Sequence, residues 1–230
     1  MKKVFITGAD RGIGHALTKE FLSQGYLVYA GQYMPEWKEL DELKLQYPET
    51  LFTVPLDVGS TDSVKAAYEL VKKQTDYLDI LVNVAGILGN IRKITFEQMF
   101  DVNTVGVIRM VDIFLPLLHS DSTICFFSSE AGSVALSERS DMEEWLGYCS
   151  SKAMLNMAIR LMFNKLNPQN YKFRVYHPGG VNGYLSGEKG TTGEYEPEDS
   201  AKKAFLQFTS KRSWEDVLIL TDIEDNTWAF

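Results

Sequence analysis

The stretch VFITGADRGIG, residues 4–14, decides the fold of this 230-residue chain. A short apolar run is followed by a glycine-rich turn and then by a segment with the apolar spacing of a helix. Glycines in such a turn let backbone N–H groups approach a pyrophosphate, and the N-terminus of the following helix adds a positive dipole. The stretch therefore predicts a strand, a phosphate-binding turn at Gly8, Gly12 and Gly14, and a helix.

The same alternation of apolar runs and helical stretches continues along the chain. Strands that are apolar throughout and separated by helices are typical of a parallel sheet covered on both faces. We therefore expect a single α/β domain built on a doubly wound, Rossmann-type parallel sheet with helices on both faces. The expected strands are residues 4–9, 27–31, 51–58, 78–86, 123–129, 173–179 and 217–221, and the expected helices are residues 13–25, 63–73, 96–118 and 148–166.

Charge and composition argue against several classes of function. A formal net charge of -8 disfavours binding to nucleic acid, which draws on clustered basic residues. The longest apolar runs fall well short of the roughly 20 residues of a membrane helix, and the N-terminal MKK shows no signal-peptide cleavage site. Cys125 and Cys149 fit reduced thiols better than a disulfide or a metal site. We expect a cytoplasmic protein that binds no metal, nucleic acid or membrane.

One stretch, residues 182–199, has several glycines and no clear period. It leaves the carboxyl end of an expected strand, which is the edge where ligands bind in open α/β sheets. Long loops inside a compact domain are usually functional or disordered. We interpret this stretch as a substrate lid.

The glycine turn and a series of later motifs, spread in order along nearly the whole chain, resemble the short-chain dehydrogenase/reductase family. The spacing of Gly8, Gly12 and Gly14 matches its glycine turn rather than the pattern of the two-domain dehydrogenases. SSEAGSVAL, GYCSSKAMLNM, FLPLL, HPGGV and DNTW are similar to the sniffer-type and C-factor-type carbonyl reductases, a single-domain branch. The further matching motifs are Asp57-Val58, Asn83-Val84-Ala85-Gly86, Asn103, Ser128-Ser129, Tyr148 with Lys152, and Pro178-Gly179.

The resemblance implies four catalytic residues, Asn103, Ser129, Tyr148 and Lys152. Free tyrosine has a pKa near ~10 and is a poor proton donor or acceptor at neutral pH. Lys152 lies one helical turn after Tyr148 on the same face, so we expect its charge, with that of the oxidised nicotinamide, to lower the pKa of Tyr148. Ser129 is expected to polarise the substrate oxygen, with Ser128 as the alternative. Asn103 is expected to support Lys152 through a water.

The resemblance also implies a nicotinamide dinucleotide. An acidic residue at the end of the second strand selects NAD, and a basic residue accepts the 2′-phosphate of NADP. Gln32 and Tyr33 stand there, and Arg11 lies in the glycine turn, so NADP(H) is favoured over NAD(H). The expected cofactor-binding residues are Gly8, Asp10, Arg11, Gly12, Ile13, Gly14, Gln32, Tyr33, Asp57, Val58, Asn83, Ala85, Gly86, Tyr148, Lys152, Pro178, Gly179 and Val181.

Some positions depart from the family pattern. Val84 replaces an asparagine, and Gly183 stands where relatives have a threonine that contacts the cofactor phosphate, a contact that Asn182 is a candidate to replace. Residues 130–147 form a lengthened segment before Tyr148 that includes Glu138. We interpret it as an extra turn or short helix at the mouth of the site, or as an oligomer contact, with surface decoration as the alternative for its acidic residues.

The function expected from these residues is an NAD(P)-dependent oxidoreductase, of carbonyl reductase or alcohol dehydrogenase type, acting on a small carbonyl or secondary alcohol. The alternative is a regulatory or interaction protein that binds the cofactor without turnover. The sugar-nucleotide epimerase branch is discarded, because it needs a C-terminal substrate region and few residues follow Pro178-Gly179. By the same resemblance we expect a homodimer or homotetramer.

Overall fold

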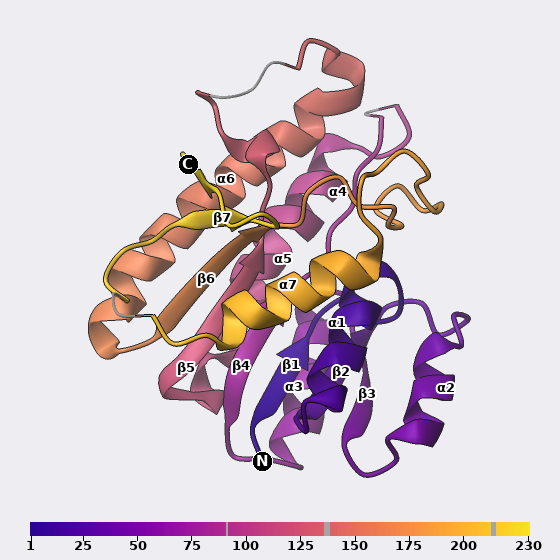
Figure 1. Ribbon diagram of the computed structural model, residues 1–230, viewed down its shortest axis with the longest axis vertical. Helices are drawn as coiled ribbons and strands as arrows, with labels where there is room; N and C mark the ends of the chain where they lie inside the picture. The colour runs from indigo at the N-terminus through magenta and orange to yellow at the C-terminus, as the bar shows by residue number, and fades with distance from the viewer. Residues whose placement is uncertain (91, 136–138, 213–214) are drawn as a thin grey trace.

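The computed structural model describes residues 1–90, 92–135, 139–212 and 215–230. Within them, one sheet runs in the order β3-β2-β1-β4-β5-β6-β7-β8, and the strand order reverses between β1 and β4 (Figure 1). Every neighbouring pair from β3 to β7 is parallel, and only β8 runs antiparallel, against β7. The strands are β1 (Lys3–Ile6), β2 (Leu27–Gln32), β3 (Leu51–Pro55), β4 (Leu78–Asn83), β5 (Leu118–Phe127), β6 (Lys172–His177), β7 (Leu220–Asp222) and β8 (Thr227–Trp228).

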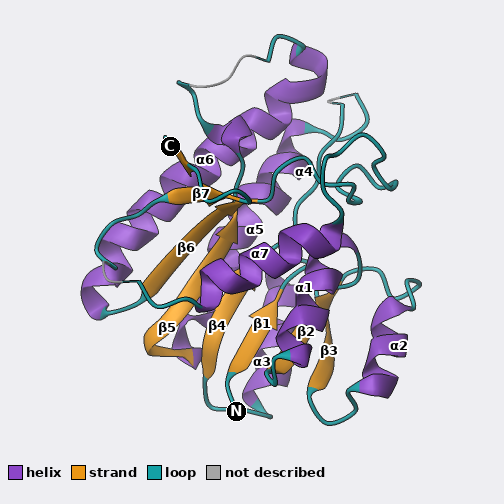
Figure 2. Ribbon diagram, viewed as in Figure 1, coloured by secondary structure: helices purple, strands orange, loops and turns teal. Residues whose placement is uncertain are grey.

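Helices cover both faces of this sheet (Figure 2). One face carries α1 (Gly12–Ser23), α2 (Glu39–Gln46) and α7 (Pro197–Thr209), whose apolar residues join one core cluster. The other face carries α3 (Thr61–Lys72), α5 (Gly106–Phe114) and α6 (Met142–Leu166), whose apolar residues join a second cluster. The expected single α/β domain with a doubly wound sheet is therefore confirmed.

The two clusters explain why the strands are apolar throughout. Side chains alternate between the faces of a strand, so Val4 and Ile6 pack into the cluster under α1 while Phe5 packs into the one under α5. All three are fully buried. Phe5 meets Phe114 of α5 with ring centroids 4.7 Å apart. Strands with one solvated face would have shown a polar residue at every second position.

Helix α6 is the longest element and carries the expected Tyr148 and Lys152. It starts at Met142, before the expected start at residue 148, because Asp141 caps it by accepting a hydrogen bond from the Glu144 N–H at 3.1 Å. Tyr148 and Lys152 lie on its buried stripe, with Leu155 and Ile159 below them. Among the described residues, no helix combines the length and the apolarity needed to cross a membrane.

Other boundaries differ from those expected. Helices α2 and α7 were not expected, because α2 buries little beyond Leu40 and Leu43 and α7 starts inside the stretch interpreted as a lid. A capping box between Glu196 and Asp199, with Pro197 at the first helical position, starts α7. The expected helix 96–118 is divided into α4 (Phe96–Phe100), the π-helix η1 (Asp101–Val105), α5 and a 3-10 turn (Leu115–Leu117).

An ion pair at the amino-terminal side of the sheet gives a stability prediction. The Arg174 guanidinium on β6 is 3% exposed, and its two terminal nitrogens lie 2.6 and 2.7 Å from the carboxylate oxygens of Glu215. Removing one partner of a buried pair leaves an uncompensated charge. We expect Glu215→Ala to lower the free energy of unfolding by about 3 kcal/mol in urea denaturation.

The matched control is the ion pair between Arg92 and Glu143, whose side chains are 75% and 52% exposed. Arg92→Gln should change the same free energy by less than about 0.5 kcal/mol. Equal losses in the two variants would contradict the assignment of Arg174 as a charge that depends on Glu215.

Candidate functional site

The glycine turn between β1 and α1 is shaped to accept an anion. Gly8 and Gly12 have φ values of +62° and +56°, which favour glycine. A Cβ on Gly14 would lie 2.0 Å from the carbonyl oxygen of Gly8, so only glycine lets the helix begin this close to the strand. Arg11 at the N-cap makes no side-chain capping bond, and the first turn has no acidic residue. The N-terminal N–H groups of α1 therefore fit a pyrophosphate, as a dinucleotide requires.

Hydrogen bonds between side chains and backbone tie this turn and the neighbouring strand ends together. The Thr7 hydroxyl accepts hydrogen bonds from the N–H groups of Val84 at 2.9 Å and Ala85 at 3.0 Å. Asn83 donates from Nδ2 to the carbonyl of Cys125 at 3.1 Å, and its buried Oδ1 has no partner among the described residues. Val84 contributes only its backbone N–H here. Any residue other than proline has this group, so the replacement of asparagine by valine keeps the contact. The sequence motifs did not single out Thr7, because its role depends on β4 lying beside β1.

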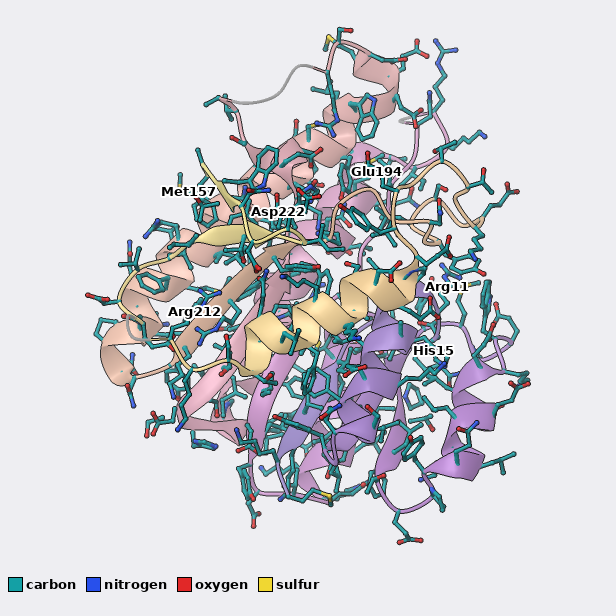
Figure 3. All side chains as sticks on the ribbon, in the orientation of Figure 1. Arg11, His15, Met157, Glu194, Arg212 and Asp222 are labelled. Carbon is teal, nitrogen blue, oxygen red and sulfur yellow. The ribbon has the colours of Figure 1, made fainter. Side chains whose placement is uncertain are left out.

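Aromatic and basic side chains gather beside the turn. The Arg11 guanidinium lies 5.1 Å from the ring centroid of Trp37 and contacts the Met34 sulfur. Trp37 packs edge to face against Tyr184 with centroids 4.8 Å apart. Figure 3 shows Arg11 at the start of α1. The loop that carries Glu194 lies at the same end of the sheet. The Asp10 carboxylate accepts the Met34 N–H at 3.0 Å, and the expected contact of Asp10 with the cofactor stays a prediction.

The other residues expected on the adenosine side also end neighbouring strands. Gln32 closes β2 and is half-buried, whereas Tyr33 is 62% exposed. The Asp57 carboxylate accepts the Gly59 N–H at 2.8 Å, and Val58 is buried. The fold thus places all four at the edge of the sheet that bears the glycine turn, with Asp57 shaping the turn after β3.

Tyr148 and Lys152 are both buried on the inner side of α6. Lys152 Nζ lies 5.7 Å from the Tyr148 ring centroid and donates to the carbonyl of Phe127 at 2.9 Å. Burial lowers the pKa of Lys152 to about 8. Burial also raises the pKa of Tyr148, and a hydrogen bond with Ser129 only partly offsets it. In the chain without cofactor, desolvation therefore outweighs the nearby charges, and the expected lowering of the Tyr148 pKa, which includes the charge of the oxidised nicotinamide, stays a prediction.

The two serines at the end of β5 point to different partners. Ser128 donates to Asn156 Oδ1 at 2.5 Å and is buried against α6. Ser129 lies near enough to the Tyr148 phenol to lower the pKa of Tyr148. Its hydroxyl also donates to Glu130 Oε2 at 2.6 Å and accepts the Ala131 N–H at 3.1 Å. The structure thus places Ser129, rather than the alternative Ser128, next to Tyr148.

Asn103 lies in the π-helix η1 and is fully buried. Its amide oxygen accepts the Ile87 N–H at 2.8 Å, and its amide nitrogen donates to the Ile87 carbonyl at 2.8 Å and to the Ser151 hydroxyl at 3.0 Å. Thr104 donates to the Ser151 carbonyl at 2.7 Å. Isolated π-helical turns are frequent at functional sites. Asn103 therefore fixes α6 one residue before Lys152, a link that runs through Ser151.

A cluster of charged groups that the motifs did not predict lies beside Tyr148. The Glu130 carboxylate pairs with Arg139, and its Oε2 lies 3.6 Å from His177 Nε2. Burial disfavours the charged form of Glu130, but hydrogen bonds from Ser129 and Arg139 outweigh it and lower its pKa. Burial lowers the pKa of His177. Glu130 and Arg139 come from the segment before α6 and His177 comes from the end of β6, so sequence spacing gave no signal that the three side chains meet.

The loop after β6 begins with the expected Pro178-Gly179. Gly179 has a φ of +77°, and Val181 forms a parallel bridge with Tyr195. The loop covers residues 182–196, because α7 takes the remainder of the expected lid. Its Leu185 carbonyl accepts the Leu88 N–H at 2.9 Å. The loop therefore lies over both the glycine turn, through Tyr184, and the segment after β4.

Asn182 is occupied inside this loop. Its amide nitrogen donates to Glu196 Oε1 at 2.7 Å, and its amide oxygen accepts the Gly193 N–H at 2.7 Å. These bonds hold the two ends of the loop together. Asn182 therefore clamps the loop, and its replacement of the absent threonine at Gly183 stays a prediction.

The lengthened segment 130–147 contributes the 3-10 turn Glu130–Gly132 and the first turns of α6. Glu138 lies outside the described residues. Trp145 packs near Tyr148, with ring centroids 6.4 Å apart, and Arg139 lies 4.6 Å from the Trp145 ring. The segment thus supplies an extension of α6 next to Tyr148, and its role at the mouth of the site or in an oligomer stays a prediction.

The family described as short chain dehydrogenase matches residues 2–193 of the chain. Estradiol 17-beta-dehydrogenase 2 of Rattus norvegicus is 29% identical over 222 residues, which cover 93% of this chain and 55% of that protein. The chain thus spans about half the length of this relative. The resemblance expected from the motifs is confirmed by the family match.

Two solved structures share the whole fold. The NADPH-bound carbonyl reductase from chicken fatty liver has a TM-score of 0.85 at 25% identity, covering 100% of this chain and 99% of that one. The carbonyl reductase Sniffer of D. melanogaster has a TM-score of 0.85 at 21% identity, covering 100% of both chains. The likeness to Sniffer is one of fold.

The glycine turn gives a prediction about binding. Gly14→Ala forces a Cβ against the Gly8 carbonyl, so the turn must open and its N–H groups move apart. We expect NADPH to bind at least about tenfold more weakly, measured by nicotinamide fluorescence. Gly190→Ala is the matched control, since the nearest atoms lie 3.6 Å from its added Cβ, an ordinary van der Waals contact. Unchanged NADPH binding in Gly14→Ala would contradict the turn as the cofactor site.

Proposed function

Because the chain belongs to the short chain dehydrogenase family, we propose that it is an NADP(H)-dependent oxidoreductase acting on a small carbonyl or secondary alcohol, with Tyr148 as proton donor and acceptor. The observation that supports this most is the buried phenol of Tyr148, in contact with Ser129 and above Lys152. A side chain that served only packing would not need both polar neighbours. The site opens at the edge of the sheet that carries the anion-binding turn.

Each proposed catalytic group has one task. When bound, the reduced nicotinamide supplies hydride to the carbonyl carbon, and the oxidised form accepts it in the reverse direction. The C=O electron pair moves onto oxygen, and that oxygen takes the Oη proton of Tyr148. Ser129 holds this oxygen in place. The Lys152 ammonium stabilises the tyrosinate that remains, until a proton returns from solvent.

Asn103 has a positioning role in this proposal. Its bonds to Ile87 and Ser151 join the segment after β4 to α6. The distance between the cofactor side of the site and the Tyr148 phenol is thereby held by the buried Asn103 side chain, which joins the Ile87 backbone to Ser151 on α6. Catalysis depends on such fixed geometry, because a small displacement of the reacting atoms lowers the rate steeply.

The proposed preference for NADP(H) is supported by charge. No carboxylate stands at Gln32 to repel a 2′-phosphate, and Arg11 lies in the adjoining turn, held beside Trp37. The chicken carbonyl reductase of the same fold is NADPH-bound. Arg11, Gln32 and Tyr33 are the residues we propose around the adenosine ribose.

The loop 182–196 is proposed to cover the substrate. It contacts the segment after β4 through Leu185 and the glycine turn through Tyr184.

A homo-oligomer also remains a proposal. Met154, Met157 and Leu161 give α6 an exposed apolar stripe, with exposed fractions of 42%, 61% and 62%.

The alternative is a cofactor-binding regulatory protein without turnover. Two observations favour it: Gly183 lacks the hydroxyl that relatives place on the cofactor, and Asn182 is committed to the loop itself. A pure binder, however, has no use for a phenol placed against both Ser129 and Lys152. Turnover measurements decide between the two.

We expect the purified protein to oxidise NADPH with at least one member of a panel of ketones, aldehydes and quinones. Tyr148→Phe should lower this turnover by about a thousandfold, because the proton donor is lost. NADPH fluorescence should show that cofactor binding is retained. Tyr171→Phe, whose hydroxyl bonds the Leu118 carbonyl at the opposite end of the sheet, is the matched control. Equal rates in Tyr148→Phe and the parent would contradict the assignment of Tyr148 as the proton donor.

A second prediction concerns the cofactor. Arg11→Gln should weaken NADPH binding about tenfold, because a charge-assisted hydrogen bond to the 2′-phosphate is lost. NADH binding, measured by the same fluorescence titration, should change less than about twofold. Equal losses for both cofactors would mean that Arg11 supports the turn and does not read the 2′-phosphate.

A further inference from the structure

Side chains from three separate segments meet beside the glycine turn. Trp37 lies in the segment after β2, Arg11 is the N-cap residue of α1, and Tyr184 belongs to the loop 182–196. The Arg11 guanidinium lies 5.1 Å from the ring centroid of Trp37, and the rings of Trp37 and Tyr184 meet edge to face with centroids 4.8 Å apart. The indole of Trp37 is therefore shared between the turn and the loop.

Trp37 itself is anchored to the glycine turn. Its N–H donates to the Met34 carbonyl at 3.2 Å. Met34 in turn donates its N–H to the Asp10 carboxylate at 3.0 Å, and its sulfur contacts Arg11. Two successive residues of the turn thus hold the segment that carries Trp37, which gives the indole a defined place.

Tyr184 rests on the same turn from the side of the loop. Its Cδ2 atom lies 3.6 Å from the position of a Cβ on Gly12, an ordinary van der Waals distance. The next residue, Leu185, accepts the Leu88 N–H at 2.9 Å, but the side chains of residues 185–189 are exposed. Exposed side chains bury little apolar surface. The hold of the loop on the turn therefore depends on the contacts of Tyr184.

We propose that Trp37 is a positioning residue that latches the loop 182–196 onto the glycine turn, through Tyr184, and thereby slows release of the nicotinamide dinucleotide. This inference rests on the proposed function. The proposed pyrophosphate site includes Gly12, which Tyr184 covers, so release of the cofactor requires this contact to open. Loss of the contact between Trp37 and Tyr184 should therefore raise the rate of release.

The same indole has a second effect, which acts through Arg11. A guanidinium can stack on an aromatic face while the N–H groups at its edge stay free to bind a phosphate. Trp37 thereby orients the residue that we propose reads the 2′-phosphate. The latch acts on NADH and NADPH alike, because both have the pyrophosphate, whereas the hold on Arg11 acts on NADPH alone.

The test measures cofactor release from the purified full chain. Bound NADH or NADPH is displaced by an excess of its oxidised form, and the loss of nicotinamide fluorescence gives the dissociation rate. We expect Trp37→Ala to raise the NADH rate about fivefold and the NADPH rate at least about tenfold. Tyr184→Ala should raise both rates about fivefold.

An unchanged NADH rate in either variant overturns the proposal. A rise for NADPH alone in Trp37→Ala would show that Trp37 serves Arg11 and not the loop. The double variant Trp37→Ala with Tyr184→Ala should release NADH no faster than Trp37→Ala alone, because both changes remove the same contact. An NADH rate raised by the product of the two single effects would show that the residues act separately and would also overturn the latch.

Two control variants separate the latch from general loosening. Trp37→Phe keeps an aromatic ring and should bring both rates to within about twofold of the parent. Tyr77→Ala is the matched control, because the Tyr77 ring has similar contacts at the opposite end of the sheet. Lys3 Nζ lies 3.8 Å from its centroid, and His119 meets it edge to face at 5.8 Å. Tyr77→Ala should leave both rates unchanged, and a rise equal to that of Trp37→Ala would contradict a local latch.

A second readout needs no cofactor. Amide hydrogen exchange, followed by mass spectrometry of peptides that cover residues 182–196, reports opening of the loop. Trp37→Ala should speed exchange there at least about threefold and leave α3 unchanged. Unchanged exchange in the loop, or faster exchange in both segments, overturns the latch. Failure of the parent to bind either cofactor would refute the proposed function, while the exchange measurement would still decide whether Trp37 holds the loop.

Discussion

The absence of a side chain at Gly14 is the constraint on which the rest of the structure depends. Helix α1 starts against the carbonyl of Gly8, at a separation that leaves a Cβ only 2.0 Å of room. This contact brings the free N–H groups of the helix to the carboxyl edge of the sheet. The turn then joins its neighbours through the Thr7 hydroxyl and through the Ala9 N–H, which donates to the Gly31 carbonyl at 2.9 Å. The strand ends that form the site are thereby held in one register.

On the other side of the strand-order reversal, α6 has two duties that use the same stripe of residues. Leu155 and Ile159 anchor it in the core, and one or two turns earlier the stripe carries Lys152 and Tyr148. Burying an ammonium and a phenol costs free energy unless partners compensate. The compensation is partial: Lys152 has the Phe127 carbonyl, and Tyr148 has Ser129. The buried apolar residues of α6 thereby stabilise the part of the helix that carries the two residues proposed for proton transfer.

The motifs predicted the relative positions of residues correctly where those positions depend only on spacing within one segment. Tyr148 and Lys152 share a face because they are four residues apart in a helix, and the glycine spacing could be read directly. The motif placed Asp10 in the glycine turn, but the bond from the Met34 N–H to its carboxylate could be seen only in the folded chain. Thr7, Ser151 and Glu130 were missed, because each works through a partner that only the packed sheet and helices bring near.

By itself, then, the sequence determined the doubly wound sheet, through the alternation of apolar runs and helical stretches, and the anion-binding turn, through its glycine spacing. The Tyr148–Lys152 pair was found through the resemblance to the family, and its four-residue spacing puts both side chains on one helix face. Only the tertiary structure decided which serine meets the phenol, where Glu130, Arg139 and His177 converge, and how far burial moves the pKa of Tyr148 and Lys152. These depend on distance and desolvation, and both are set by segments that are far apart along the chain.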